Sequence, residues 1–511
     1  MSTNESLSPT RAPEKSDHRW LVLVVVSIAQ LMVVLDATIV NIALPSAQAD
    51  LGFDNSQRQW VVTAYALAFG SLLLLGGRVG DIVGRKRTFL IALVAFAAAS
   101  ALGGAAPSFA VLVFARALQG VAGAMLAPAA LGTLVTTFVN PRDRGKAFGV
   151  FGTVAVGGGA VGLILGGILT QYLSWRWCMY VNVFIAALAV IGALVYMSEA
   201  KPATRPRIDI GGTILAGLGL FSLVFGFSQA ETDGWASRVT MVSLVLGVAL
   251  LAVFVRVEQR VGHPLLPLRI VTNRSRGMAF AAVGIAGLAM FGLFLFLTYY
   301  LQLVKHFSPV TSGLAFLPMI GCIIISSNTS NIVTLPRFGP RIVITVGMVT
   351  GFLGLSYLSR ITVHSSYAGG VLPALMLMGL AMGMVMAPSM NTATAGVQPR
   401  DSGVAAALVS TMQQVGGAIG TAVLSTVAAS VTASYASSHL PVHGFNAVAA
   451  THGYATVFLT SALVFATGAI LAAAFFPSKA RLSAMRESVP APSTAPASED
   501  GARSEARGVE V

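Results

Sequence analysis

Two charged side chains lie inside long apolar stretches of the sequence. Asp36 is the one of 19 acidic residues, and Arg116 the one of 32 basic residues, that falls well inside such a stretch. An ionised side chain at the centre of a bilayer costs about 3 kcal/mol or more, so such residues face the protein interior and mark an ion or substrate path. A buried carboxylate favours its protonated form, and a nearby guanidinium reverses that preference. The two residues are therefore candidates for proton transfer; the alternative is a buried ion pair that only fixes helix packing.

The composition shows what must position them. The chain has 511 residues, 55% hydrophobic and 10% charged, with a mean hydropathy of +0.78. Soluble domains carry about 25% charged residues, so an ordinary soluble enzyme and a disordered chain are both excluded. A helix needs about 20 apolar residues to cross a bilayer. We count fourteen such segments, which predicts an all-α integral membrane protein.

The basic residues are distributed unevenly between the loops. With the N-terminus placed in the cytoplasm, 26 of the 32 fall in cytoplasmic segments and five in outer loops. This asymmetry is typical of the positive-inside rule and predicts that both termini are cytoplasmic, in a multi-pass protein of the cell membrane. It also accounts for most of the formal net charge of +13, so we expect lipid and not nucleic acid as the partner of these residues.

The two halves of the sequence echo one another. The segment Gly123–Pro128 matches Gly383–Pro388, and Pro141–Ala147 matches Pro399–Ala405, at nearly the same offset. That offset spans eight predicted helices, an even number, so both copies have the same orientation. Parallel six-helix repeats are the plan of one large class of secondary transporters. The predicted domains are an N-terminal tail (1–19), a six-helix bundle (20–200), two inserted helices (201–260), a second six-helix bundle (261–476) and a disordered cytoplasmic tail (477–511).

Five motifs carry a resemblance to a known family. They are Leu35–Pro45 (LDATIVNIALP), Gly77–Arg87 (GRVGDIVGRKR), Arg116–Gly120 (RALQG), a series of glycines in the fifth predicted helix, and Trp175–Arg–Trp177 followed by Val181–Asn–Val183. The sequence resembles the major facilitator superfamily, and within it the fourteen-helix drug/proton antiporters of the EmrB/QacA type. The resemblance implies proton coupling through Asp36 and Arg116. It implies an inner-gate loop at Gly77, Asp81, Gly84, Arg85 and Lys86, and an antiporter motif at Gly149, Gly158, Gly162, Gly166 and Gly167.

The motifs also have physical readings of their own. Glycines in the loop allow a tight turn, the basic run can hold it to anionic headgroups or act only as a topology signal, and Asp81 can cap the helix that begins near Gly403. The glycines of the fifth helix make a flat face, expected to pack on the other half of the protein. Leu163 stands where the family motif has a proline, which removes a kink-forming residue.

The resemblance places the first, fourth, ninth and twelfth predicted helices around the substrate. The candidate cavity residues combine aromatic rings and methionine with amides, a wall suited to amphiphilic organic molecules. They are Asn41, Gln119, Phe291, Phe294, Tyr299, Gln302, Asn328, Met386, Asn391 and Gln413. Because the second half offers no intramembrane acid, we expect neutral, zwitterionic or anionic hydrophobic substrates in preference to dications. Lipid-facing aromatics and core methionines are the alternative for about half of this set.

The predicted function is a proton-coupled antiporter that exports hydrophobic or amphiphilic drugs by alternating access. One alternative is an exporter of an endogenous metabolite, amino acid or siderophore; another is a transport-dead membrane sensor or scaffold. We expect no enzyme activity, no cofactor and no ATP, since the sequence has neither a second intramembrane catalytic group nor a phosphate loop. We expect no metal site, because solvated loop histidines explain His439 and His443. The expected partners are small molecules, protons and lipids. We expect the protein to be a monomer.

Overall fold

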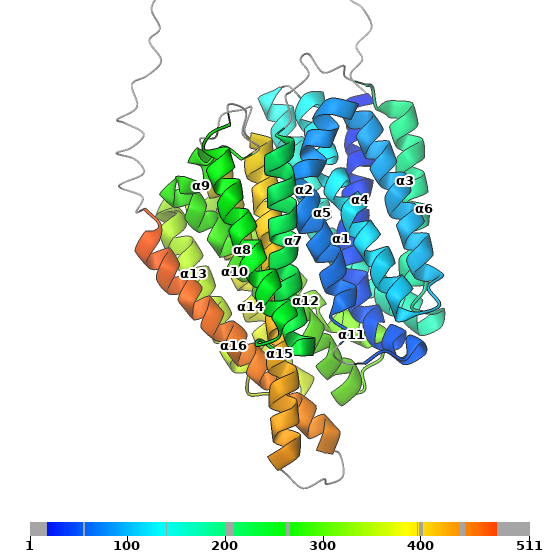
Figure 1. Cartoon of the computed structure of the whole chain (residues 1–511), viewed down its shortest axis with the longest axis vertical. Coiled ribbons are helices and arrows are strands. Elements are labelled where there is room, and N and C mark those ends of the chain that lie inside the picture. Colours follow the sequence, from blue (N-terminus) through cyan, green and yellow to red (C-terminus); the bar gives the residue numbers. More distant parts are fainter. Residues whose placement is uncertain are drawn as a thin grey trace, which may run out of the picture.

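The structure is a computed structural model that describes residues 18–54, 57–138, 140–199, 209–261, 266–395, 397, 402–438 and 445–477. Regular structure in these ranges is entirely helical. The long helices run side by side along the long axis of the molecule (Figure 1), and α1 begins and α16 ends toward the same end of the bundle. This confirms the predicted all-α fold class.

The first group of helices contains both intramembrane charges. It consists of α1 (His18–Leu51), α2 (Trp60–Val83), α3 (Arg85–Gly104), α4 (Phe109–Thr137), α5 (Pro141–Tyr172) and α6 (Trp177–Tyr196). Connections between them are short, and Gly84 separates α2 from α3 with φ +101°, a conformation that favours glycine. These helices enclose apolar side chains, among them Met32, Phe89 and Phe96, all less than 2% exposed.

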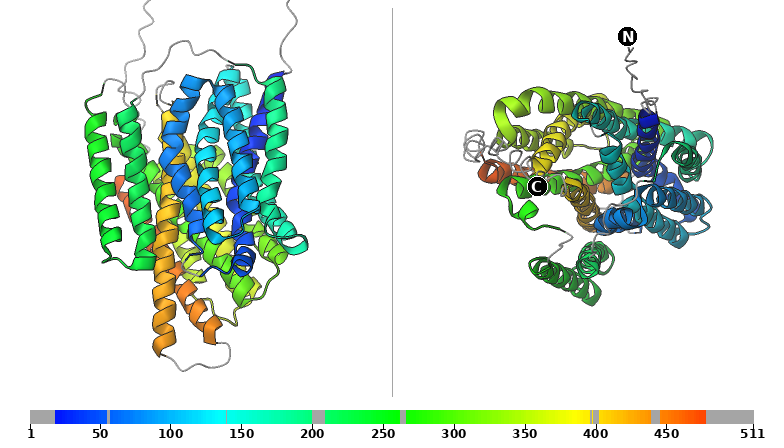
Figure 2. Two further views of the ribbon diagram at one scale, coloured as in Figure 1. Left: turned by 45° about the vertical axis from the view of Figure 1, so that its right-hand side comes forward. Right: turned by 90° about the horizontal axis from the view of Figure 1, so that it is seen from above.

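Two helices follow that stand beside the main bundle. These are α7 (Ile210–Asp233) and α8 (Arg238–Glu258), joined by a turn at Gly234, whose φ is +83°. Asp209 caps α7, since its carboxylate accepts a hydrogen bond from the Gly212 amide at 2.8 Å. Figure 2 shows the pair at the side of the molecule, where α7 packs on α2 and α15.

The last group forms the second half. It consists of α9 (Arg269–Thr272), α10 (Arg274–Tyr299), α11 (Pro309–Ala315), α12 (Leu317–Thr329), α13 (Leu335–Leu358), α14 (Leu372–Thr394), α15 (Ser402–Ser438) and α16 (Phe445–Phe475). Short π-helical turns extend α10 (Tyr300–Val304) and α12 (Ser330–Thr334), and another precedes α14 (Tyr367–Val371). At Gly339 the backbone of α13 leaves helical geometry, with φ 79° and ψ 167°.

The sequence repeat has a counterpart in packing. In the first half, a Cβ added to Gly123 of α4 would lie 2.9 Å from the ring of Phe69 on α2. In the second half, a Cβ added to Gly383 of α14 would lie 2.5 Å from the backbone nitrogen of Ser327 on α12. The matching glycines therefore let the fourth helix of each half approach the second.

The described part of the chain contains 12 helices long and apolar enough to cross a membrane. Two of the fourteen predicted segments are not separate members of that set. Residues Pro309–Leu358 form one nearly continuous 50-residue helical stretch, and the described apolar part of α2 is the shorter Trp60–Leu73. The number fourteen therefore stays a prediction, whereas a multi-pass helical membrane protein is well supported.

Candidate functional site

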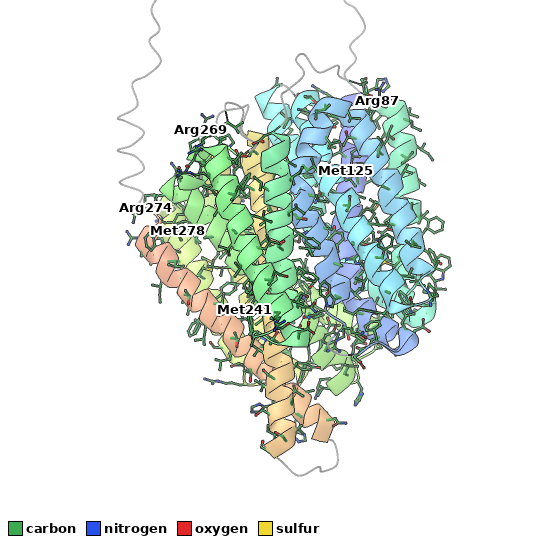
Figure 3. All side chains as sticks on the ribbon, viewed as in Figure 1. Arg87, Met125, Met241, Arg269, Arg274 and Met278 are labelled. Carbon is green, nitrogen blue, oxygen red and sulfur yellow. The ribbon has the colours of Figure 1, made fainter. Side chains whose placement is uncertain are left out.

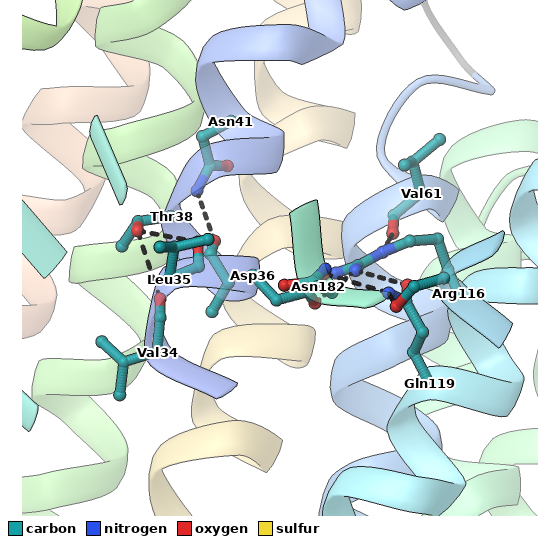
Figure 4. A network of polar contacts seen from close by, with 11 residues as sticks. Val34, Leu35, Asp36, Thr38, Asn41, Val61, Arg116, Gln119 and Asn182 are labelled. Atoms are coloured by element: carbon teal, nitrogen blue, oxygen red, sulfur yellow. Dashed lines mark hydrogen bonds and ion pairs between the residues drawn. The ribbon is translucent and has the colours of Figure 1, made fainter. Parts of the chain in front are cut away.

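Asp36 lies at the centre of the first half, on α1. Its side chain is 0% exposed. Its polar neighbours on the same helix bond to their own backbone: Thr38 donates to the carbonyls of Val34 and Leu35, and Asn41 donates to that of Ala37 (Figure 4). The carboxylate of Asp36 is directed toward side chains of α4 and α6.

Three donors from two helices hold the carboxylate. Arg116 on α4 donates from its terminal nitrogen to Asp36 Oδ2 at 2.6 Å. Gln119 Nε2 on α4 and Asn182 Nδ2 on α6 donate to Asp36 Oδ1 at 3.0 and 2.8 Å. The sequence left open whether Asp36 and Arg116 touch; in the structure they form a buried ion pair, and Arg116 is 2% exposed.

Arg116 has further partners on α2 and α4. Its Nε donates to the Val61 carbonyl of α2 at 3.0 Å, and its terminal nitrogen also donates to Gln119 Oε1 at 2.8 Å. The guanidinium carbon lies 4.5 Å from the centre of the Tyr65 ring, a favourable position for a cation. Removing one partner of a buried pair leaves an uncompensated charge and destabilises a protein by about 3–5 kcal/mol.

The site is separated from one end of the bundle by apolar side chains. Between Asp36 and the end of α1 at Leu51, a small pocket inside the first half is lined mainly by aliphatic groups, including Val40, Leu44 and Met179. A proton that reached Asp36 would neutralise the carboxylate and weaken its charge-assisted bond to Arg116. The arrangement can therefore couple one protonation event to the contacts among α1, α2, α4 and α6.

Sequence reasoning missed part of this network. Ser100 on α3 accepts from Gln119 Nε2 at 2.7 Å, and Asn182 and Tyr65 complete the surroundings of the ion pair. Asn182 did stand in a quoted motif, so its sequence context carried a signal. The Val61 carbonyl carries none, because every residue has one.

The basic residues of the predicted inner-gate loop bind backbone carbonyls of neighbouring helices. Arg85 donates to the Gly132 carbonyl in α4 at 2.6 Å, and Lys86 donates to the Met197 carbonyl at the end of α6 at 2.6 Å. Lys86 thereby satisfies a free carbonyl at the C-terminus of α6 and complements the helix dipole. The basic run therefore ties α3 to α4 and α6.

The structure describes the surroundings of Gly77 and Gly84 in the same loop, but not the side chain of Asp81. A Cβ on Gly77 would meet Pro128 at 3.6 Å, an ordinary contact, whereas Gly84 needs its positive φ. The side chain of Asp81 lies outside the described part, as do residues 398–401, so its predicted capping role stays a prediction. His439 and His443 also lie outside the described residues.

The glycines of the predicted antiporter motif pack mostly within their own half. A Cβ added to Gly158, Gly162 or Gly166 would meet α1, at Leu31, Thr38 and Ile39 respectively. Their expected packing on the other half is thus corrected for these three, because the glycine face of α5 is turned toward α1.

Two further glycines of the series differ from these three. A Cβ on Gly167 would lie 2.6 Å from the Val310 Cα of α11, so Gly167 does face the other half. Gly149 lies in α5 outside the described side chains. Leu163 is 0% exposed, in place of the motif proline.

The predicted cavity residues do not gather in one place. The ring centres of Phe294 and Phe316 lie 5.0 Å apart, and the ring of Phe291 packs against Gly417. Both phenylalanines therefore belong to the packing of the second half. Asn391 Nδ2 donates to Asn331 Oδ1 at 2.7 Å, and the exposed Asn328 donates to its own helix.

The remaining cavity candidates are divided as well. Met386 and Gln413 are partly buried, Asn41 bonds to its own helix, and Gln119 belongs to the ion-pair network.

Two of the set connect the halves. Gln302 donates to the Ile42 carbonyl of α1 at 3.1 Å. The Arg58 guanidinium, from the α1–α2 connection, lies 3.3 Å from the centre of the Tyr299 ring of α10. With the Val310–Gln171 contact between α11 and α5, these interactions join the halves at the end of the molecule where α1 ends and α2 begins.

These features define a class: a multi-pass helical membrane protein whose first group of helices encloses a buried ion pair. A family model described as the Major Facilitator Superfamily matches residues 26–421. The chain belongs to that superfamily and is a membrane transporter by family.

Named relatives and solved structures agree with this assignment. The chain is 48% identical over 456 residues to a puromycin resistance protein of Streptomyces alboniger, covering 89% of this chain and 90% of that protein. It is 37% identical over 432 residues to a cephamycin export protein of Amycolatopsis lactamdurans, covering 83% and 88%. In fold it is similar to a crystal structure of an auto-inhibited POT family peptide transporter, with a TM-score of 0.65 at 15% identity over 89% of this chain and 96% of that one.

Proposed function

We propose that this protein exports hydrophobic or amphiphilic antibiotics from the cytoplasm in exchange for protons. The observation that carries the proposal is the buried Asp36–Arg116 pair, enclosed by amide donors, in a superfamily transporter. Relatives whose names state resistance or export of puromycin, cephamycin and tetracenomycin C support the substrate class.

The proton would act through the charge on Asp36. A neutral Asp36 no longer balances Arg116, so the contacts of α1 with α4 and α6 change with protonation. One proton supplies about 1.4 kcal/mol per pH unit and about 2.3 kcal/mol per 100 mV. Alternating access would then exchange the present closure, which involves Gln302 and Tyr299, for closure at the opposite end.

We propose fourteen crossings of the plasma membrane with both termini in the cytoplasm. Arg87, Arg269 and Arg274 lie toward the same end of the molecule (Figure 3), which supports a cytoplasmic assignment of that end. In this proposal the break at Gly339 would divide the 50-residue stretch into two crossings, and the full length of α2 would supply another. This is the topology of the EmrB/QacA type.

The proposal includes further expectations about what the protein binds. It would work as a monomer in contact with lipid, without a cofactor, ATP or nucleic acid, and would catalyse no reaction. Substrates would be neutral, zwitterionic or anionic, since the long helices of the second half, α10 to α16, carry no acidic residue to pair with a cation.

The test is drug-dependent proton movement in inside-out vesicles with an acidified interior. The panel would include puromycin, lincomycin and tetracenomycin C, with wild type, Asp36→Asn, Arg116→Ala and the control Asp54→Asn, a change at an exposed loop residue. We expect compound-driven proton release with wild type and Asp54→Asn, and none with the two ion-pair variants.

The alternatives give different results. An exporter of a metabolite would move protons with an amino acid or siderophore and with no antibiotic of the panel. A transport-dead scaffold would move protons with no compound, and all four proteins would behave alike. Equal proton release by Asp36→Asn and wild type would refute the role of Asp36.

A further inference from the structure

The side-chain oxygen of Asn182, beside the ion pair, has no hydrogen-bond partner in the described structure. Asn182 is 0% exposed on α6; its Nδ2 donates to Asp36 Oδ1 at 2.8 Å, and its Oδ1 is buried with no hydrogen bond. An unsatisfied buried polar atom has lost its hydrogen bonds to water without replacing them, so such an atom in a membrane core needs an explanation.

The surroundings of Asp36 suit a carboxylate and not a carboxylic acid. Its hydrogen bonds come from Arg116, Gln119 and Asn182, and all three are donors. A protonated carboxyl group carries an O–H that needs an acceptor. For Asp36 to bind a proton, at least one of these side chains must therefore present an acceptor atom in place of its donor.

Gln119 is not free to make that change. Its Oε1 accepts from Arg116 at 2.8 Å, and its Nε2 donates to Ser100 at 2.7 Å as well as to Asp36. A half-turn of its amide would place N–H groups against the guanidinium. Asn182 has no such restraint, because its second amide atom bonds to nothing in the described structure.

We propose that Asn182 is the positioning residue that lets Asp36 take up and release its proton. Its amide donates to the ionised carboxylate and, after a half-turn about its last side-chain bond, its Oδ1 accepts from the protonated Oδ1–H of Asp36. One proton is added to Asp36 Oδ1, and the bond from Arg116 to Oδ2 remains. This inference rests on the proposed proton coupling through Asp36.

Other ionisable groups face the site without supplying that acceptor. Arg116 has no acceptor atom. The Tyr65 hydroxyl is also buried without a hydrogen-bond partner, but it points away from Asp36 toward Gly123, where an added Cβ would lie 3.4 Å from it. The Cys178 thiol is directed to α5, where it contacts the Thr170 hydroxyl at 3.3 Å. α3 contributes Ser100, whose hydroxyl is engaged by Gln119.

Infrared difference spectroscopy tests this directly on the whole transporter in lipid. A protonated carboxyl group has a carbonyl band that a carboxylate lacks, and an amide carbonyl absorbs at lower wavenumber once it accepts a hydrogen bond. With asparagine isotopically labelled at its side-chain carbonyl, we expect one labelled band to move to lower wavenumber on acidification. It should move in step with the carboxylic acid band and be absent in Asp36→Asn.

Three variants assign the band. Asn182→Leu should abolish the shift and lower drug-driven proton release about tenfold. Asn182→Thr, whose hydroxyl both donates and accepts, should restore part of that rate. Asn41→Leu changes another buried asparagine, whose amide bonds only to α1, and should keep the shift.

The outcomes separate the two proposals. An acid band that appears with no moving asparagine band would overturn the role of Asn182 and leave proton binding at Asp36 intact. A wild-type protein that shows no Asp36-dependent acid band across the pH range would instead remove the proposed coupling, and this inference with it.

Discussion

Gly162 on α5 sits where a single added methyl group would press on the helix that carries Asp36. A Cβ at Gly162 would lie 2.1 Å from Thr38 Oγ1 and 3.0 Å from the Leu35 carbonyl oxygen. At Gly157, one and a half turns earlier on the same helix, an added Cβ would meet nothing within 4 Å. Gly162→Ala and Gly157→Ala thus add the same methyl group to α5, and only the one at residue 162 would press on α1.

The size of the effect follows from these distances. Thr38 can rotate away only by giving up its bonds to the Val34 and Leu35 carbonyls. The Leu35 backbone must move by a few tenths of an ångström. Overpacking of this kind costs about 1–3 kcal/mol, and replacing a helical glycine with alanine returns about 1 kcal/mol. We therefore expect a net loss of about 0–2 kcal/mol in stability.

Transport should suffer more than stability. Leu35 directly precedes Asp36, whose bond to Arg116 is 2.6 Å, so a small displacement of α1 acts on the ion pair itself. Because a misplacement of about 1 Å can lower a rate about a hundredfold, a few tenths of an ångström correspond to a several-fold loss. Gly157→Ala should transport at the wild-type rate and be as stable or slightly more so.

The assay pairs proton release in vesicles with thermal unfolding in detergent. Drug-driven release should fall several-fold in Gly162→Ala while the unfolding temperature changes little, and Gly157→Ala should match wild type in release. Identical release by the two variants would refute the reasoning, because the glycine at 162 would then not set the position of α1.

Three further changes test the contacts at the two ends. Arg58→Leu removes the buried cation from the Tyr299 ring, a contact that contributes about 2 kcal/mol when desolvated. Spin-label distances between the two halves, at the end where α1 ends and α2 begins, should therefore lengthen. Unchanged distances would contradict the role of Arg58 in closing this end. Gly84→Ala imposes a side chain at φ +101° and should lower stability by about 1–3 kcal/mol in thermal unfolding, whereas wild-type stability would show that the turn adapts. Lys86→Met should lower the unfolding temperature through lost bonds to the end of α6; a variant that is equally stable would leave Lys86 only a topology signal.

The sequence identified functional candidates where a side chain is energetically unfavourable in a membrane. Asp36 and Arg116 were found because charge is expensive in lipid, and the structure confirms that they lie inside the bundle. Their contact could not be predicted, because 80 residues separate them and no local pattern reports distance. Asn182 stood in a quoted motif but was given no role, because an amide carries no charge and its position in the sequence does not show that it faces Asp36.

The cavity residues show where this reasoning runs out. In a soluble helix, the apolar face indicates the core; in a membrane helix both the lipid face and the core face are apolar, so periodicity loses its meaning. Phe294 and Tyr299 were therefore assigned from composition and from the expected position of their helix. The structure places both in the packed interior, at 6% and 1% exposure. Aromatic type alone does not distinguish a ring that binds substrate from one that fills the second half.

The same point changes the reading of α5. Its glycines at 162 and 166 place its backbone directly on α1 beside Asp36, and on its other side Gly313 of α11 would bring a Cβ within 2.3 Å of the Leu163 carbonyl oxygen. In both contacts the helix backbones lie close together, so few side-chain atoms can adjust when one helix moves. A displacement of α1 on protonation would thus be passed through α5 to the interface between the halves. Leu163 suits this arrangement because α5 stays continuous from Pro141 to Tyr172 and can move as one rigid element.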